Sequence, residues 1–126
     1  MPRSDRPKRP RLRRSEFDPV YTALIANGRF FEDPGYYSRY ESRYRYLIDL
    51  LSELELPASS KLLDIGGGQI AILAREFFGF DTTVADVSDI YAEYIRELGL
   101  PFFSFDLSRD AVPWVDEFDV VVLSEV

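Results

Sequence analysis

Three successive glycines and the acids near them are the residues whose spacing suggests chemistry. The glycines at 66–68 follow a short apolar run and precede a helical pattern. Glycine lets the chain turn sharply there and present bare backbone N–H groups to a ligand. Asp86 lies 20 residues beyond Gly66, at the end of the next apolar run. A carboxylate at that position can accept hydrogen bonds from the two hydroxyls of a ribose, so the spacing predicts a nucleoside-binding site.

The candidate side chains all follow predicted strands, so they should lie at one edge of a parallel sheet. They are Asp64, Asp86, Asp106 and Ser124. Each has a simpler explanation: Asp86 or Ser88 as a cap of the following helix, Asp106 as a turn former, the glycines as a tight turn without a ligand. The convergence of three acids on one sheet edge favours ligand binding.

The elements that must position these residues follow from the hydrophobic pattern. Helices are predicted over residues 17–27, 36–56, 69–78 and 88–98, and strands over 62–65, 82–85, 101–105 and 118–123. Alternation of strands with helices predicts an α/β fold, a parallel sheet of four strands with crossover helices, preceded by N-terminal helices. The apolar strands suggest a sheet covered on both faces. The connection over residues 106–117 leaves room for at most a turn or two of helix.

Proline, glycine and aspartate residues predict where the two N-terminal helices begin and end. Asp18 followed by Pro19 predicts a helix start, and Gly28 predicts its end. Residues 33–35, Asp-Pro-Gly, predict a turn before the second helix.

Composition excludes several chemistries. The 126 residues contain neither cysteine nor histidine, which excludes disulfides, thiolate nucleophiles, histidine bases and most zinc sites. No apolar run approaches the roughly 20 residues that a membrane-spanning helix needs. The expectation is a cytoplasmic protein without membrane contact.

The charge is distributed unevenly. Residues 1–14 hold seven of the 15 basic residues and one acid, while the remainder holds eight basic and 21 acidic residues. Three prolines in this basic arm predict disorder. The arm could contact nucleic acid, or it could be a solubilising tail. The predicted organisation is the arm (1–14), a helical segment (15–57) and a sheet domain (58–126).

The glycine turn and the later strand ends resemble a known family. Residues 62–68, Leu-Leu-Asp-Ile-Gly-Gly-Gly, are similar to motif I of the class I S-adenosylmethionine-dependent methyltransferases. Residues 84–88 resemble the family's second motif, 105–107 the segment after its third strand, and 118–126 its fourth-strand motif. The resemblance covers residues 61–126, about half of the chain, and implies a Rossmann-like sheet and methyl transfer to an unidentified acceptor.

The resemblance also implies a set of cofactor contacts. These are Asp64, Gly66, Gly67, Gly68, Asp86, Val87, Asp106, Leu107 and Ser124. Asp64 would hold the cofactor's amino group directly or through water, and Asp86 would bind the ribose hydroxyls. Val87 and Leu107 would pack against the adenine, and Asp106 would reach the adenine amine. The cofactor carries the reactive methyl group, and the protein supplies positioning.

Two features depart from the family pattern. Ile70 stands where a third motif glycine is usual, which could narrow the pocket or shift the helix. The fourth strand is internal in the family's sheet, whereas here the sequence ends at Val126. The resemblance therefore implies the N-terminal portion of a larger enzyme, which would bind the cofactor without turnover.

Two other functions stay open. Residues 66–71 also satisfy the dinucleotide fingerprint, with Asp86 at the required distance, which would indicate an NAD(P) or FAD domain. Against this, Asp64 would face the negative pyrophosphate, whereas it would attract an amino group. The second alternative is a non-catalytic methyltransferase-like scaffold that contacts RNA through its basic arm.

Overall fold

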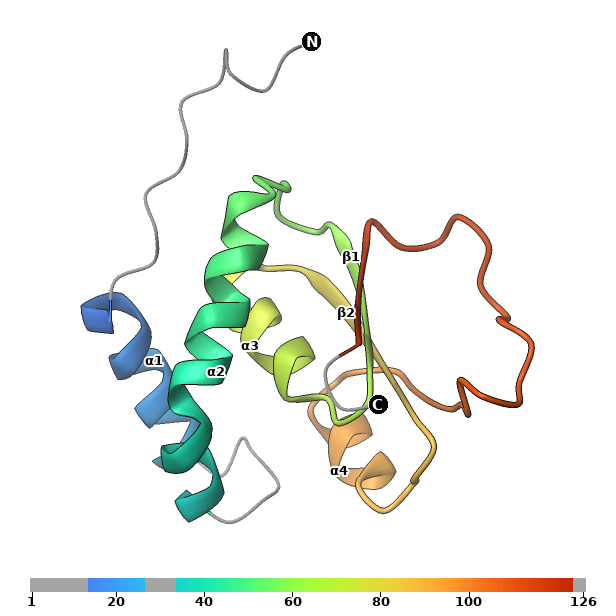
Figure 1. The fold of residues 1–126 in the computed structure, drawn as a ribbon, viewed down its shortest axis with the longest axis horizontal. Helices are drawn as coiled ribbons and strands as arrows, with labels where there is room; N and C mark the ends of the chain where they lie inside the picture. Colours follow the sequence, from blue (N-terminus) through green and yellow to red (C-terminus); the bar gives the residue numbers. More distant parts are fainter. Residues whose placement is uncertain (1–13, 27–33, 124–126) are drawn as a thin grey trace, which may run out of the picture.

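The computed structural model describes residues 14–26 and 34–123 (Figure 1). The elements within them are α1 (Arg14–Ala26), α2 (Pro34–Glu53), β1 (Lys61–Ile65), α3 (Gln69–Phe78), β2 (Asp81–Asp86), α4 (Ala92–Glu97), β3 (Phe102–Ser104) and β4 (Val120–Leu123). The basic arm up to residue 13, the helix stop at Gly28 and the contact at Ser124 lie outside the described residues. Arg14, which the sequence assigns to the arm, opens α1.

The four strands form one all-parallel sheet in the order β3-β2-β1-β4. The chain steps from β1 outward to β3 through α3 and α4, then returns to the other side of β1 as β4. The predicted α/β class and parallel sheet are confirmed, and the arrangement is compatible with a Rossmann-like fold. In open sheets of this kind, ligands bind at the carboxyl ends of the strands, where the order reverses. That point lies here between β1 and β4.

All the helices of the described chain contribute to one core on one face of the sheet (Figure 1). Leu62 and Val84 point into this core from β1 and β2, and both are fully buried. The ring of Phe17 in α1 stacks on that of Phe77 in α3, with centroids 5.5 Å apart. The N-terminal helices and the sheet therefore share a single hydrophobic core.

The opposite face of the sheet is covered differently, by the connection between β3 and β4 that swings outward in Figure 1. Over residues 106–119 this connection contains turns and no helix. Its Trp114 and Phe118 pack against a small buried cluster: Leu63, Ile65, Ala85 and Phe105. Val121 and Leu123 of β4 remain 51 % and 54 % exposed on this face. The prediction of a sheet covered on both faces therefore holds for the helical face and only partly for the other.

The predicted starts of the two N-terminal helices are wrong. The first helix starts at Arg14, so Pro19 lies inside it rather than at its first turn. Pro34 and Gly35 open α2 instead of forming a turn. Proline suits the first position of a helix because its missing N–H would be unpaired there in any case.

The helix between β2 and β3 is shorter than predicted. It covers Ala92–Glu97 rather than residues 88–98. Ser88 forms a turn of its own instead, because its Oγ accepts a hydrogen bond from the N–H of Ile90 at 3.3 Å. By contrast, α3 has its predicted bounds, and Gly79 ends it with a φ of +68°.

No helix within residues 14–26 and 34–123 is both long and apolar enough to cross a membrane.

Candidate functional site

The glycine turn joins β1 to α3 at the carboxyl edge of the sheet. Gly66, Gly67 and Gly68 have φ values of +98°, +115° and +102°, which L side chains rarely adopt. A Cβ at Gly68 would also lie 3.3 Å from Cγ1 of Val84 and 3.4 Å from Cδ1 of Ile95. Backbone conformation favours glycine at all three positions, and the tight packing around Gly68 favours it further there.

The side chain of Asp64 faces α3 and is shielded from solvent. Its side chain is fully buried, and its Oδ2 accepts a hydrogen bond from the N–H of Ala71 at 3.1 Å. Ala71 is the third residue of α3, and Gly68 at the N-cap has no side chain to cap the helix. Asp64 therefore supplies the capping carboxylate from the neighbouring strand. The contact with an amino group that the resemblance implies stays a prediction.

Asp86 ends β2 beside the turn, as the sequence predicts. Its Oδ2 accepts a hydrogen bond from the N–H of Gly67 at 3.2 Å, and its Oδ1 accepts one from the backbone N–H of Ser88 at 3.3 Å. Its carbonyl accepts a hydrogen bond from the N–H of Phe105 at 2.9 Å. The simpler reading of Asp86 as a helix cap is excluded, because α4 begins only at Ala92.

Asp106 follows β3, the strand next to β2, and is engaged in a turn. Its Oδ1 accepts hydrogen bonds from the Oγ–H of Ser108 at 2.6 Å and from the N–H of Ser108 at 3.0 Å. These hydrogen bonds stabilise the carboxylate and lower the pKa of Asp106 below its ordinary value. Its own N–H donates to Oδ2 of Asp110 at 2.7 Å. The turn-former reading of Asp106 is therefore confirmed, and it leaves the carboxylate ionised at neutral pH.

Apolar side chains follow the two acids and remain open to solvent. Val87, directly after Asp86, is 67 % exposed, and Leu107, directly after Asp106, is 46 % exposed. Ile90 is 77 % exposed, and sequence reasoning missed it because residues 88–98 were expected to form one helix. Exposed apolar groups beside charged ones are suited to a ligand that carries both a polar and a flat apolar part.

Ile70, for which the sequence left open a narrowed pocket or a shifted helix, does not line the turn. It is fully buried in the core formed by the helices and the sheet. The helix begins at Gln69, as predicted. The side chain that replaces the third motif glycine therefore packs away from the open side of the turn.

The predicted residues fall into two groups. In the first group, Gly67 donates a hydrogen bond to Asp86, and Asp64 accepts one from Ala71 at the start of α3. Asp106 stands on the next strand in its own turn. Across the part of the chain that the structure describes, no group of three or more acidic side chains could hold a metal ion.

Comparison with known proteins adds no relative. No protein-family model matches the sequence, and neither a curated protein nor a solved structure gives a match. The parallel sheet and the geometry around the glycine turn are therefore the basis for a functional argument.

Proposed function

We propose that the carboxyl edge of the sheet binds S-adenosylmethionine, and that the chain serves in methyl transfer from this cofactor. The observation that carries the proposal is the buried hydrogen bond from Ala71 to Asp64. It supports S-adenosylmethionine over a dinucleotide, two ligands that the glycine turn alone would accept equally well.

A dinucleotide places its pyrophosphate on the first N–H groups of the helix after the glycine turn. In this chain, the carboxylate of Asp64 already accepts the N–H of Ala71 at that end of α3. Its negative charge already interacts with the positive end of the α3 dipole, and it would repel a second anion at short range. The amino group of a methionine moiety would be attracted to the same position.

The nucleoside part of the cofactor fits the remaining groups. Asp86 lies beside the turn and can accept hydrogen bonds from ribose hydroxyls, in exchange for its 3.2 Å hydrogen bond from Gly67. Val87 and Leu107 expose apolar surface that an adenine ring would cover. When bound, the cofactor would supply an electrophilic methyl group on its sulfonium. The contribution of the chain is to hold and orient it.

The proposal is tested by calorimetric titration with S-adenosylhomocysteine and, separately, with NAD. S-adenosylhomocysteine should bind and NAD should not. Asp86→Asn should weaken binding by about tenfold or more, since a hydrogen bond to a charged group contributes about 1.5–3 kcal/mol. Asp89→Asn is the matched control, because it removes the same charge from an exposed position three residues away.

Each other outcome contradicts the proposal in a different way. Binding of NAD alone would indicate a dinucleotide domain. Binding of neither ligand would indicate a scaffold. Equal losses in Asp86→Asn and Asp89→Asn would show that net charge, rather than a contact with Asp86, sets the affinity.

A further inference from the structure

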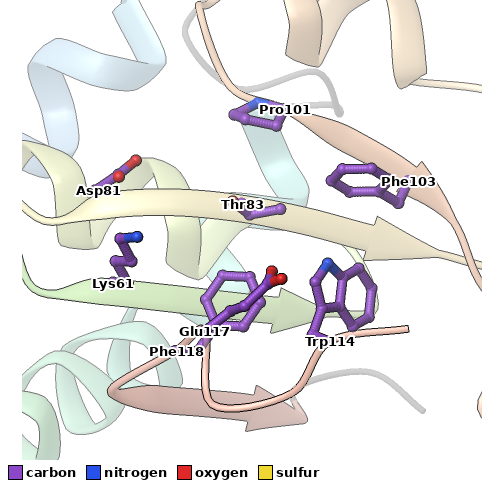
Figure 2. Close-up of a pocket in the computed structure, with 8 residues that line it drawn as sticks. All are labelled: Lys61, Asp81, Thr83, Pro101, Phe103, Trp114, Glu117 and Phe118. Atoms are coloured by element: carbon purple, nitrogen blue, oxygen red, sulfur yellow. The ribbon is translucent and has the colours of Figure 1, made fainter. Parts of the chain in front are cut away.

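A pocket lies on the sheet face opposite the helices (Figure 2). It has a volume of about 260 Å³ and spans the first residues of β1 and β2 and the start of β3. The glycine turn stands at the other end of these parallel strands. The pocket is therefore separate from the proposed cofactor site.

Aromatic rings form one wall of this pocket. The indole of Trp114 meets the ring of Phe103 at 5.6 Å and that of Phe118 at 5.8 Å, with interplanar angles of 79° and 76°. The side chain of Phe103 is still 46 % exposed, so part of its ring surface is open to a ligand in the pocket. The faces of aromatic rings carry negative electrostatic potential. The wall therefore favours a positively charged or apolar group.

The charged residues of the pocket have one negative charge in excess. Lys61 and Asp81 are directly opposed in the register of β1 and β2, so their charges are neighbours on one face. Glu117 adds a further carboxylate, which points toward the Trp114 side of the pocket in Figure 2.

The backbone holds Glu117 at this position. Asp119, two residues further along the chain, forms two hydrogen bonds with Lys61: its Oδ2 accepts the N–H of Lys61 at 2.8 Å, and its own N–H donates to the carbonyl oxygen of Lys61 at 2.8 Å. The segment that carries Glu117 is thus fastened to the first residue of β1. The carboxylate is presented to the aromatic wall by an anchored chain.

We propose that this pocket binds a small organic ammonium ion, of the alkylated or quaternary kind. Such an ion is weakly hydrated, carries apolar methyl groups, and is attracted both to ring faces and to the excess carboxylate. An organic anion would be repelled by Glu117 and by the rings. A bare metal ion would need several oxygen ligands, and no suitable acidic cluster exists in the described ranges.

The test uses the full chain and choline as the probe. Trp114 is the one tryptophan of the sequence, so its fluorescence reports on this pocket alone. Choline should change the emission saturably, while 3,3-dimethyl-1-butanol, a neutral molecule of the same shape, should not. Sodium chloride at equal ionic strength should also have no effect.

Variants identify the groups responsible. Glu117→Gln should weaken choline binding about fivefold, as expected for the loss of one exposed charge interaction. Glu93→Gln on α4, an exposed acid on the other side of the sheet, should leave it unchanged. Phe103→Leu should also weaken it, because one ring face is lost while Trp114 is kept.

Three results would overturn the proposal. One is a non-saturable response to choline, and another is an equal response to the neutral alcohol. The third is unaltered affinity in both Glu117→Gln and Phe103→Leu, with each variant shown to be folded by circular dichroism.

Discussion

Oδ2 of Asp64 accepts a hydrogen bond from the N–H of Ala71 at 3.1 Å, and both residues are fully buried. The strand that precedes the glycine turn thus caps the helix that follows it. This contact joins the two ends of the glycine turn and places the negative charge of Asp64 at the N-terminal end of α3. It connects the stability of the fold to the kind of ligand the turn can accept.

Replacing Asp64 should first affect stability. Asp64→Ala leaves the buried N–H of Ala71 without its acceptor, which should lower the free energy of unfolding by about 1–3 kcal/mol. Asp64→Asn should be less harmful because an amide oxygen can still accept. Urea denaturation measures both, with Asp89→Ala as the control. Equal stability of Asp64→Ala and the unmodified chain would show that the cap contributes nothing.

A pair of glycine variants separates backbone strain from crowding. Gly68→Ala and Gly99→Ala both force a residue with a side chain into positive φ, at a cost of roughly 1–2 kcal/mol. At Gly68 the new Cβ would also meet Val84 at 3.3 Å, whereas at Gly99 the nearest atom is 3.8 Å away. Gly68→Ala should therefore be the less stable by about a further 1 kcal/mol in denaturant titration. The reverse order would contradict the packing around the turn.

The pKa of Asp106 should depend on Ser108. The side-chain hydrogen bond from Ser108, then its backbone hydrogen bond, hold this pKa below the ordinary 3.8. The stabilisation is present above pH 3.8 and is lost as the pH falls through the lowered pKa of the folded protein. Ser108→Ala removes the hydroxyl and should raise the pKa part of the way back. Carbon-13 NMR titration of the Asp106 carboxyl measures this, and an unshifted value would contradict the assigned cause.

The single shared core predicts one cooperative unfolding transition. Phe17→Ala removes a fully buried ring that stacks on Phe77 of α3, so it should cost about 3–5 kcal/mol. Tyr46→Ala on α2, where the side chain is 61 % exposed, should cost far less. Calorimetry with two separate transitions, the first lost in Phe17→Ala, would show instead that the N-terminal helices form an independent unit.

Local signals in the sequence predict the part of the site closest to the turn. Glycine at both ends of residues 69–78 fixes α3, because these positions require positive φ. Asp86 meets Gly67 because adjacent parallel strands end at the same edge. These features depend on neighbours in sequence or on one strand pairing, so periodicity and turn chemistry are sufficient.

Other features depend on packing that no local pattern records. The bond from Asp64 to Ala71 requires the exact placement of α3 over β1. The late start of α4 at Ala92 follows a separate turn, in which Oγ of Ser88 accepts a hydrogen bond from the N–H of Ile90. Trp114 and Phe118 of the aromatic wall belong to an irregular connection, and their positions depend on packing against the sheet rather than on local sequence.

The most direct test of the proposed function is an amide ¹H–¹⁵N NMR titration of the full chain with S-adenosylhomocysteine. The account predicts saturable shifts at residues 66–68, 86–88 and 106–107, with no shifts there on addition of NAD at the same concentrations. Saturable shifts at these residues with NAD and none with S-adenosylhomocysteine would contradict it. So would an unperturbed glycine turn with both ligands.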